Sequence, residues 1–322
     1  MKYFVPLRSA ATSLFLTAAI LCLWAPGPVR AQDPNAPVMQ RRFDSPDTAT
    51  KALQEAVKTG DQAALEEIFG PDKHDLLTGD KVQDKANFDH FSAAMQAGCV
   101  QEPEGDDRVI LGIGTNDWPF PIPLVKTNGQ WFFDTDSGRT EIIDRHIGRD
   151  ELYAIGVCRA YVTAQNQYFS RDRDGTGVSK YALKFKSSPG KKDGLFWDST
   201  DEASPFSALA AEAHAEGYDR NLSNSKPHPF HGYFFKILTR QGSAAPGGKA
   251  DYLVKGELTG GFALVAYPVQ WGKSGIKTFI VDRDGVVYER DFQEKTWETA
   301  IHMTRYNPDN TWSVVSESGI PM

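Results

Sequence analysis

The sequence predicts an α+β fold in which helices pack on antiparallel sheets, and two observations lead to this prediction. Apolar residues recur at helical spacing in two stretches, 46–95 and 149–170. Each stretch is followed by short, alternating apolar segments with turn sequences between them. Short turns join neighbouring strands antiparallel. We therefore expect two domains: residues 43–145, with helices on a small antiparallel sheet, and residues 146–322, with a long helix on a second antiparallel sheet.

Three helices are expected to open the first domain. Ser45-Pro46 combines a cap with a proline at the first helical position, and Gly60 ends this helix. Asp61 caps a second helix, which Gly70-Pro71 stops. The apolar residues Phe88, Phe91, Ala94 and Met95 indicate the third helix. Three strands are expected after it, at 108–113, 120–125 and 130–133, with Thr127-Asn128-Gly129 as the hairpin turn between the last two. This order resembles a cone of the nuclear-transport-factor type, a scaffold that implies no function.

A long helix is expected to open the second domain at Arg149 and to run to Ser170. Asp150 and Glu151 suit its positive end, and its wide apolar arc predicts burial against a sheet. The expected strands of that sheet are 232–238, 250–254, 261–267, 276–281 and 285–288, with Asp284-Gly285 as the last hairpin turn.

The first 31 residues have the composition of a secretion signal. Lys2 and Arg8 precede the apolar run 14–24, which is too short to span a bilayer, and Val29-Arg30-Ala31 offers a cleavage site. Residues 32–42 lack periodicity and are expected to form a flexible leader. No later stretch has the roughly 18 apolar residues of a membrane helix. We therefore expect a periplasmic or extracellular protein without a membrane span in its mature chain.

The expected mature chain is acidic. The whole sequence holds 35 Lys and Arg residues against 42 Asp and Glu residues. Three of the basic residues and none of the acids precede residue 32, so the mature net charge is −10. This charge argues against an electrostatic nucleic-acid binder.

Two cysteines remain after the signal, Cys99 and Cys158. A disulfide between them is one alternative in an oxidising compartment. The other is a pair of buried free thiols, because Cys158 lies within an apolar helical stretch.

A series of motifs runs through the second half in order. The series is Arg145-His146-Ile147-Gly148-Arg149, Cys158-Arg159-Ala160-Tyr161-Val162, Asp172-Arg173-Asp174-Gly175-Thr176-Gly177, Ser188 to Trp197, His231-Gly232-Tyr233, Gly260 to Pro268 and Thr278 to Tyr288. Together these motifs resemble the exported bacterial proteins grouped as domain of unknown function 2950, and the likeness extends from about Phe43. His146 and Thr176 depart from the family pattern. That family has no assigned reaction, cofactor or catalytic residue to carry over.

A second likeness concerns the fold of the second half. One long helix, a sheet strand ending in Tyr267-Pro268 and the segment from Ser274 to Tyr288 are similar to the soluble heads of type IV pilins and pseudopilins. In those proteins the helix begins as a membrane-spanning stalk, whereas a polar domain precedes it here. The resemblance therefore implies a pilin-head-like fold and not filament assembly.

Asp172, Asp174 and Thr176 have the spacing that opens a calcium loop. Leu183 stands where such a loop needs its bidentate acid, so a plain polar turn after the helix is the competing interpretation. Calcium is the only cofactor that the sequence suggests.

Aromatic side chains are the remaining candidates for binding. Trp197 and Trp271 lie in glycine-rich loops, where a large ring has less reason to be buried and can contact a glycan or a protein. With Tyr267 and His231 they form the predicted binding residues. No catalytic residue is assigned, since no Gly-x-Ser-x-Gly turn occurs and Cys158 is expected to be buried.

These observations favour a non-enzymatic binding or assembly module of the bacterial cell envelope, with an envelope protein or a glycan as its partner. Two alternatives stay open. One is an envelope hydrolase or glycan-processing enzyme with an acid pair that the sequence does not reveal. The other is a calcium-stabilised structural module.

Overall fold

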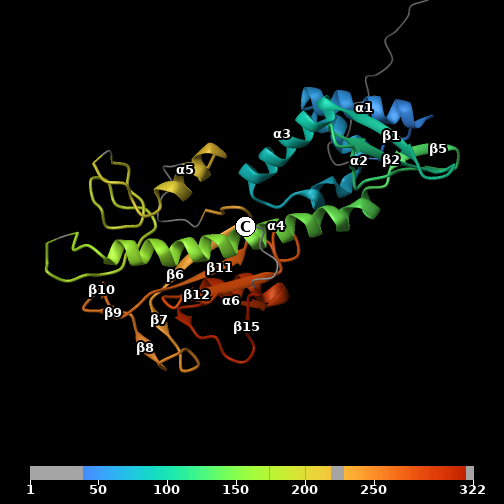
Figure 1. The fold of residues 1–322 in the computed structure, drawn as a ribbon. Coiled ribbons are helices and arrows are strands. Elements are labelled where there is room, and N and C mark those ends of the chain that lie inside the picture. The colour runs from blue at the N-terminus through green and yellow to red at the C-terminus, as the bar shows by residue number, and fades with distance from the viewer. Residues whose placement is uncertain (1–38, 174, 200, 219–227, 317–322) are drawn as a thin grey trace, which may run out of the picture. The chain divides into compact units, whose positions relative to one another are not determined.

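The computed structural model describes residues 39–173, 175–199, 201–218 and 228–316. The expected secretion signal and most of the expected leader lie outside the described residues. The described residues form helices and mainly antiparallel sheets, which confirms the α+β prediction (Figure 1).

Local signals determine the first helices as predicted. Ser45 caps the first helix by accepting a hydrogen bond from the N–H of Thr48, and Gly60 ends it with a φ of 68°. Asp61 caps the second by accepting from two backbone N–H groups. The helices are α1 (Pro46–Thr59), α2 (Gln62–Phe69), the 3₁₀ helix η1 (Pro71–Leu76) and α3 (Lys81–Ala97).

A five-stranded antiparallel sheet follows α3, in the order β1-β2-β4-β5 with β3 paired to β2. The strands are β1 (Cys99–Pro103), β2 (Arg108–Ile113), β3 (Trp118–Pro119), β4 (Leu124–Thr127) and β5 (Gln130–Phe133). Asn128 and Gly129 form the predicted hairpin turn, with φ values of 54° and 81°. The strand expected at 120–125 begins only at Leu124, because two prolines precede it and lack the N–H that pairing requires.

Helix α4 (Thr135–Phe169) begins well before Arg149, so the expected helix start is wrong. Asp134 caps it by accepting from the N–H of Ser137. Gly138 allows the new helix to pack closely against the connection between β3 and β4, since a Cβ atom there would lie 2.6 Å from the side chain of Ile122.

The early start of α4 has two consequences. Asp150 lies in the middle of the helix and is buried, so it does not serve the positive helix end as expected. The expected domain boundary between residues 145 and 146 also falls inside this helix.

The central sheet of the second half is antiparallel, in the order β15-β13-β12-β11-β6. Its strands are β6 (Tyr233–Leu238), β11 (Ala263–Pro268), β12 (Lys277–Asp282), β13 (Tyr288–Asp291) and β15 (Ser313–Val314). All six residues of β11 are buried, as expected for a central strand covered on both faces.

Two helices cover the two faces of this sheet. Helix α4 runs along one face, where Tyr161 packs edge-on against Phe262 (Figure 1). Helix α6 (Thr296–His302) covers the other through Trp297, whose ring lies 5.5 Å from Phe234 and 5.9 Å from Tyr267.

Short elements complete this half of the chain. They are α5 (Ser207–Ala215), β7 (Arg240–Gln241), β8 (Ala250–Asp251), β9 (Leu253–Val254), β10 (Glu257–Leu258), the 3₁₀ helix η2 (Gln293–Lys295) and β14 (Arg305–Tyr306). The strand expected at 250–254 is therefore two strands: β8 pairs with β7 and β9 pairs with β10. Tyr252, buried between them, separates the two pairings.

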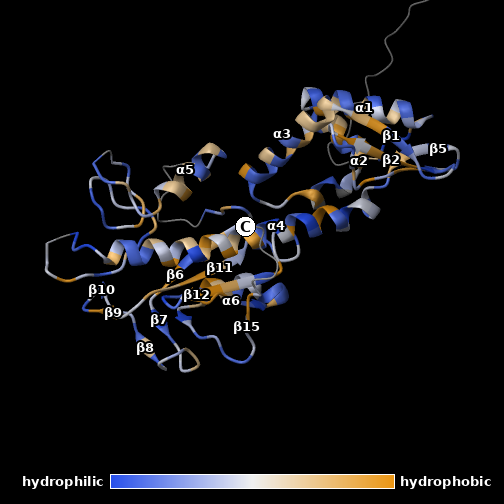
Figure 2. Cartoon of the chain, in the orientation of Figure 1, coloured by the Kyte–Doolittle hydropathy of each residue, from blue (hydrophilic) through white to orange (hydrophobic). Residues whose placement is uncertain are grey.

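The apolar residues form two cores. One gathers residues from Phe43 to Phe133, and the other gathers residues from Ala154 to Tyr306 around the central sheet. In Figure 2 the hydrophobic colour is concentrated around β11 and β12 of the central sheet. Among the described residues, no helix combines the length and the apolar character that crossing a membrane requires.

Candidate functional site

The first predicted binding residue, Trp197, is buried, with only 6% of its surface exposed. Its Nε1 donates a hydrogen bond to the carbonyl of Glu202, and the Arg173 guanidinium lies 4.9 Å from its ring centroid. Glu202 also pairs with Arg173 at 2.6 Å and with Lys192 at 2.8 Å. The expectation that a glycine-rich loop leaves Trp197 exposed is wrong, because the loop folds over the indole through these ion pairs.

The other predicted binding residues contact different parts of the fold. Tyr267 is 3% exposed and lies beneath α6, whereas Trp271 is partly buried and donates from Nε1 to Asp291 at 2.9 Å. His231 stacks on Tyr153. The four predicted residues thus have different neighbours, and the structure does not gather them into one surface.

The loop proposed for calcium uses Asp172 internally. The Asp172 carboxylate accepts hydrogen bonds from the N–H groups of Thr176 at 3.2 Å and Gly177 at 2.6 Å. Asp174 lies outside the described residues. Within the described part of the chain, no three His, Cys, Asp or Glu side chains gather as a metal site would need.

Cys99 and Cys158 are both free thiols in the structure, but only Cys158 is buried, so the second alternative, a pair of buried free thiols, holds for Cys158 alone. Cys158 is fully buried, and burial raises the pKa of its thiol to about 12. Cys99 is partly exposed, and burial raises its pKa as well.

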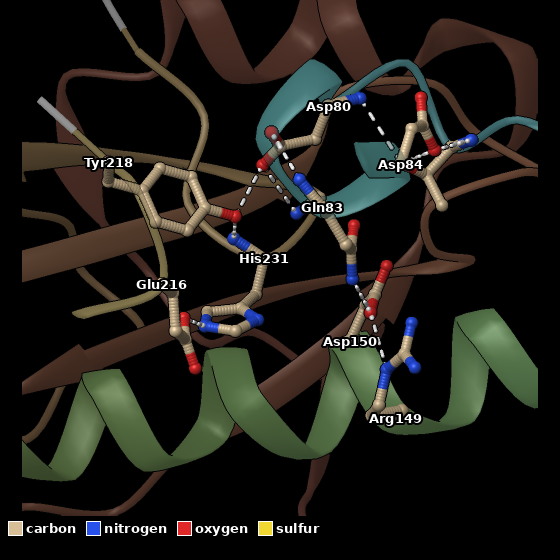
Figure 3. Close-up of polar contacts among 10 residues, drawn as sticks. Asp80, Gln83, Asp84, Arg149, Asp150, Glu216, Tyr218 and His231 are labelled. Carbon is tan, nitrogen blue, oxygen red and sulfur yellow. Dashed lines mark hydrogen bonds and ion pairs between the residues drawn. The ribbon is translucent and has the colours of Figure 1, made fainter. Parts of the chain in front are cut away.

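A buried polar cluster, which the sequence did not predict, brings α3, α4 and the segment before β6 together (Figure 3). We call it the Asp150 cluster. It consists of Asp80, Gln83, Arg149, Asp150, Glu216, Tyr218 and His231.

Asp80 connects two parts of the cluster. As the cap of α3, its Oδ1 accepts from the N–H groups of Val82 and Gln83 at 3.0 and 3.3 Å. Its Oδ2 accepts from the Tyr218 hydroxyl at 2.8 Å and from the N–H of Gly232 at 3.4 Å. With 1% of its surface exposed, Asp80 is a helix cap and also an anchor for the segment that precedes β6.

Asp150 is the most deeply buried acid of the cluster, and its side chain is fully inaccessible. Its Oδ1 accepts from Gln83 Nε2 at 2.5 Å, and Arg149 Nε lies 3.5 Å from the same oxygen. Burial raises the pKa of Asp150 to about 7, because the arginine and the amide offset only part of the desolvation and the Asp80 charge raises it further. Asp150 therefore exchanges its proton near neutral pH.

His231 precedes Gly232, the residue that packs against Asp150, and has an unusual backbone φ of 45°. Its Nε2 is 2.6 Å from Glu216 Oε2, but among the described residues it makes no hydrogen bond of good geometry. Burial, together with the Arg149 charge, lowers the pKa of His231 to about 4, while burial raises the pKa of Glu216. At neutral pH the imidazole is therefore uncharged.

A hollow of the described surface lies away from the Asp150 cluster. The hollow lies between the end of α1 and α3, where Val57, Phe88 and Ala97 are among its lining residues, and no cluster residue lines it. The arrangement can therefore store and exchange a proton.

One signal in the sequence could have indicated Asp150. Ile147 lies three residues before it, and Ala154 lies four residues after it, and both are buried. An acid at that spacing lies on the apolar stripe of a helix, where a charged group needs a special partner. The partner Gln83 could not be read from the sequence, because it lies 67 residues away.

Comparisons with known proteins give a family and no activity. No curated protein and no solved structure matches this chain, so the likeness to pilin heads has no support from known folds. A family model does match residues 40–315, which is most of the chain. The chain therefore belongs to the family described as protein of unknown function DUF2950.

Proposed function

We propose that this protein is an exported, non-enzymatic binding or assembly module of the bacterial cell envelope, and that its partner is an envelope protein. Exposed apolar side chains in the second half of the chain support this proposal. Four of them lie on two paired segments: Val178, Leu183, Leu253 and Val254, with 51%, 39%, 38% and 50% of their surfaces exposed. We call these four residues the apolar set. Exposed apolar groups that gather on a protein are characteristic of interaction surfaces.

The two segments that carry the apolar set pair with each other. Tyr181 forms a bridge with Leu258, and Leu258 pairs with Leu253 across the hairpin of β9 and β10. An ion pair of 2.9 Å between Lys180 and Glu257 joins the same segments. The apolar side chains are therefore presented by connected backbone and not by separate loops.

The neighbouring loops are held by the contacts around Trp197. Arg173, whose side chain is only 7% exposed, pairs with Glu202 and lies over both Trp197 and Tyr168. Loops that are ordered before binding lose less conformational entropy when a partner docks. In this proposal Trp197 orders a neighbouring loop and does not contact the partner.

The hydrolase alternative has less support. It requires acids with raised pKa values that face a cleft. Burial raises the pKa of Asp150 to about 7, but this side chain is fully buried and does not line the hollow between α1 and α3.

Site-specific photo-crosslinking in the producing bacterium tests the proposal. A photoreactive amino acid is placed at Val178 or Val254, and at Val314 as a control, since Val314 is also an exposed valine but lies on β15. We expect one discrete adduct from the first two positions and none from Val314, with its yield reduced about tenfold by Leu183→Asp. Equal adducts at all three positions, or turnover of a defined envelope glycan by the purified protein, would contradict the proposal.

A further inference from the structure

Strand β6 is an edge of the central sheet: β11 pairs with it on one side, and no described strand pairs with it on the other. The N–H of Val269 donates to the carbonyl of Gly232 at 2.9 Å, where the register of the two strands continues beyond β6. In an antiparallel ladder, hydrogen-bonded pairs alternate with non-bonded pairs. Every second residue counted from Gly232 therefore directs its backbone N–H and C=O to β11. The residues between them direct theirs to the outer edge: Tyr233, Phe235 and Ile237.

This outer edge is occupied at both ends and free between them. Tyr233 exchanges two backbone hydrogen bonds, at 2.8 and 3.1 Å, with the turn that precedes the strand. Just beyond the strand, the carbonyl of Thr239 accepts from the N–H of Tyr252 at 2.9 Å. Among the described residues, the outward N–H and C=O groups of Phe235 and Ile237 have no hydrogen-bond partner. We call these two residues the β6 gap, whose backbone groups an added strand would satisfy.

A cation without an acidic partner lies in the middle of the β6 gap. The Lys236 ammonium donates to the carbonyls of Ala300 and Ile301, at 2.7 and 2.8 Å. An ammonium has three donors, so one remains. Burial lowers the pKa of Lys236, and no carboxylate of the described chain lies near enough to raise it. The unpaired backbone and the unpaired charge therefore occur at the same place.

The edge of the first sheet shows how this chain protects an edge elsewhere. Strand β1 carries Pro103, which has no N–H to offer, and the exposed Glu102. Strand β6 contains no proline, and its one charged side chain, Lys236, is turned to α6. The β6 gap thus lacks the features that prevent an edge from pairing.

We propose that the β6 gap docks an extended segment of another polypeptide, which adds a strand to the central sheet and places an acidic side chain opposite Lys236. Backbone hydrogen bonds to Phe235 and Ile237 hold the segment, and the acid pairs with the remaining donor of the ammonium. A second copy of this chain is a poor occupant. Antiparallel pairing of two such gaps would set Lys236 opposite Lys236, and like charges at directly opposed positions repel.

The side chains beside the gap suit an apolar segment with one acid. Phe235 and Ile237 are partly exposed on one face of the sheet. On the other face Trp297, whose ring lies 5.5 Å from Phe234, is 46% exposed, and Ile301 is 37% exposed. The side chains of an added strand alternate between these two faces and would cover apolar surface on both. No residue of the apolar set takes part, so the inference goes beyond the proposed function.

Amide hydrogen exchange, measured by NMR on the full mature chain without a partner, tests whether the gap is open. After correction for intrinsic rates, we expect the N–H groups of Phe235 and Ile237 to exchange at least about 100-fold faster than those of Lys236 and Leu238, which bond to β11. Equal protection of all four amides would mean that the edge is already covered, and would overturn the inference.

Photo-crosslinking in the producing bacterium tests the occupant. A photoreactive amino acid replaces Ile301, whose carbonyl contacts Lys236. We expect one discrete adduct with another polypeptide, and an Asp or Glu in the crosslinked peptide. Ile237→Pro removes one outward N–H and no bond to β11, so it should reduce the yield about tenfold, whereas Ile237→Val should retain it.

The charge is tested in the same way. Lys236→Met removes the ammonium and should also reduce the yield about tenfold, whereas Lys295→Met, which removes an exposed cation just before α6, should not. This comparison decides the matter if Ile237→Pro does not fold. Leu183→Asp should leave the Ile301 adduct unchanged, so the inference and the proposed function can fail separately.

Four results of the crosslinking would overturn the inference. They are the absence of an adduct, an adduct with the mass of two copies of this chain, an adduct with a glycan, and a yield that neither Ile237→Pro nor Lys236→Met reduces. The last result would mean that the partner contacts α6 and not the β6 gap.

Discussion

Gln83 donates a hydrogen bond of 2.5 Å to Asp150, and both side chains are buried. The bond joins the first turn of α3 to the middle of α4. An acid at such a place is stable only when it is neutral or well compensated, and here the compensation is limited to one amide and one arginine at 3.5 Å. The stability of the protein is therefore coupled to the proton on Asp150.

The first prediction concerns Asp150→Asn and pH. The pKa of Asp150 is about 7 in the folded protein and about 3.9 in an unfolded chain, so the folded state binds the additional proton between these values. The contribution of Asp150 to stability is thus full below pH 4 and decreases as pH rises to 7. At pH 8.5 the asparagine variant should be more stable than the wild type by up to about 4 kcal/mol, and near pH 4 the two should be similar. Urea unfolding across this range measures the difference, and a constant difference at all pH values would contradict the assignment.

The second prediction concerns His231, whose contribution to the stability of the folded protein changes with pH in the opposite direction to that of Asp150. Its pKa falls from an ordinary value of 6.5 to about 4 in the folded protein, so the unfolded chain binds the additional proton between pH 4 and 6.5. The contribution of His231 therefore increases with pH in this window, by at most about 3 kcal/mol. His231→Asn, which tolerates the positive φ, should reduce this increase. Denaturation at pH 4.5 and 6.5 tests this, with His302→Asn as the exposed control. If the free energy of unfolding increased between pH 4.5 and 6.5 as much in His231→Asn as in the wild type, the imidazole would not be buried.

Elements that depend on local signals were predictable from the sequence. Ser45 and Asp61 cap helices, and Asn128-Gly129 turns a hairpin, through contacts within a few residues. The start of α4 was missed because Gly138, which would ordinarily weaken a helix, is required by the close approach of Ile122. Such a tertiary reason is not visible in one sequence.

The candidate site was harder to predict for the same reason. Gln83 and Asp150 are 67 residues apart, and Asp80 and Tyr218 are 138 residues apart. For Trp197 the local composition was misleading. A glycine-rich loop suggests that the ring is exposed, whereas the ion pairs of Glu202 hold the loop over the ring and bury it. His231 was the one predicted residue that belongs to the Asp150 cluster.

The third prediction concerns the glycine that contacts Asp150. Gly232→Ala places a methyl group 2.6 Å from Asp150 Oδ2 and 2.9 Å from Ser274 Cβ, at a φ of 70°. We expect a loss of about 2–4 kcal/mol in the free energy of unfolding. Gly256→Ala is the matched control, because its φ is 85° and no heavy atom lies within 4 Å of the new methyl group. It should cost only about 1 kcal/mol. Thermal or urea denaturation compares the two, and equal losses would show that backbone strain alone is responsible.

The fourth prediction concerns the two thiols. Cys158 is fully buried with a pKa raised to about 12, so it has almost no reactive thiolate at pH 8. Cys99 is partly exposed and should react with a thiol reagent in the folded protein, whereas Cys158 should react only after denaturation. Labelling in the native and denatured states, followed by peptide mass spectrometry, separates the two. Cys99→Ser should therefore abolish native labelling. A peptide pair joined through Cys99 and Cys158 in a non-reducing digest of the exported protein would contradict this prediction, and would mean that the oxidised chain brings together two side chains that are separate thiols here.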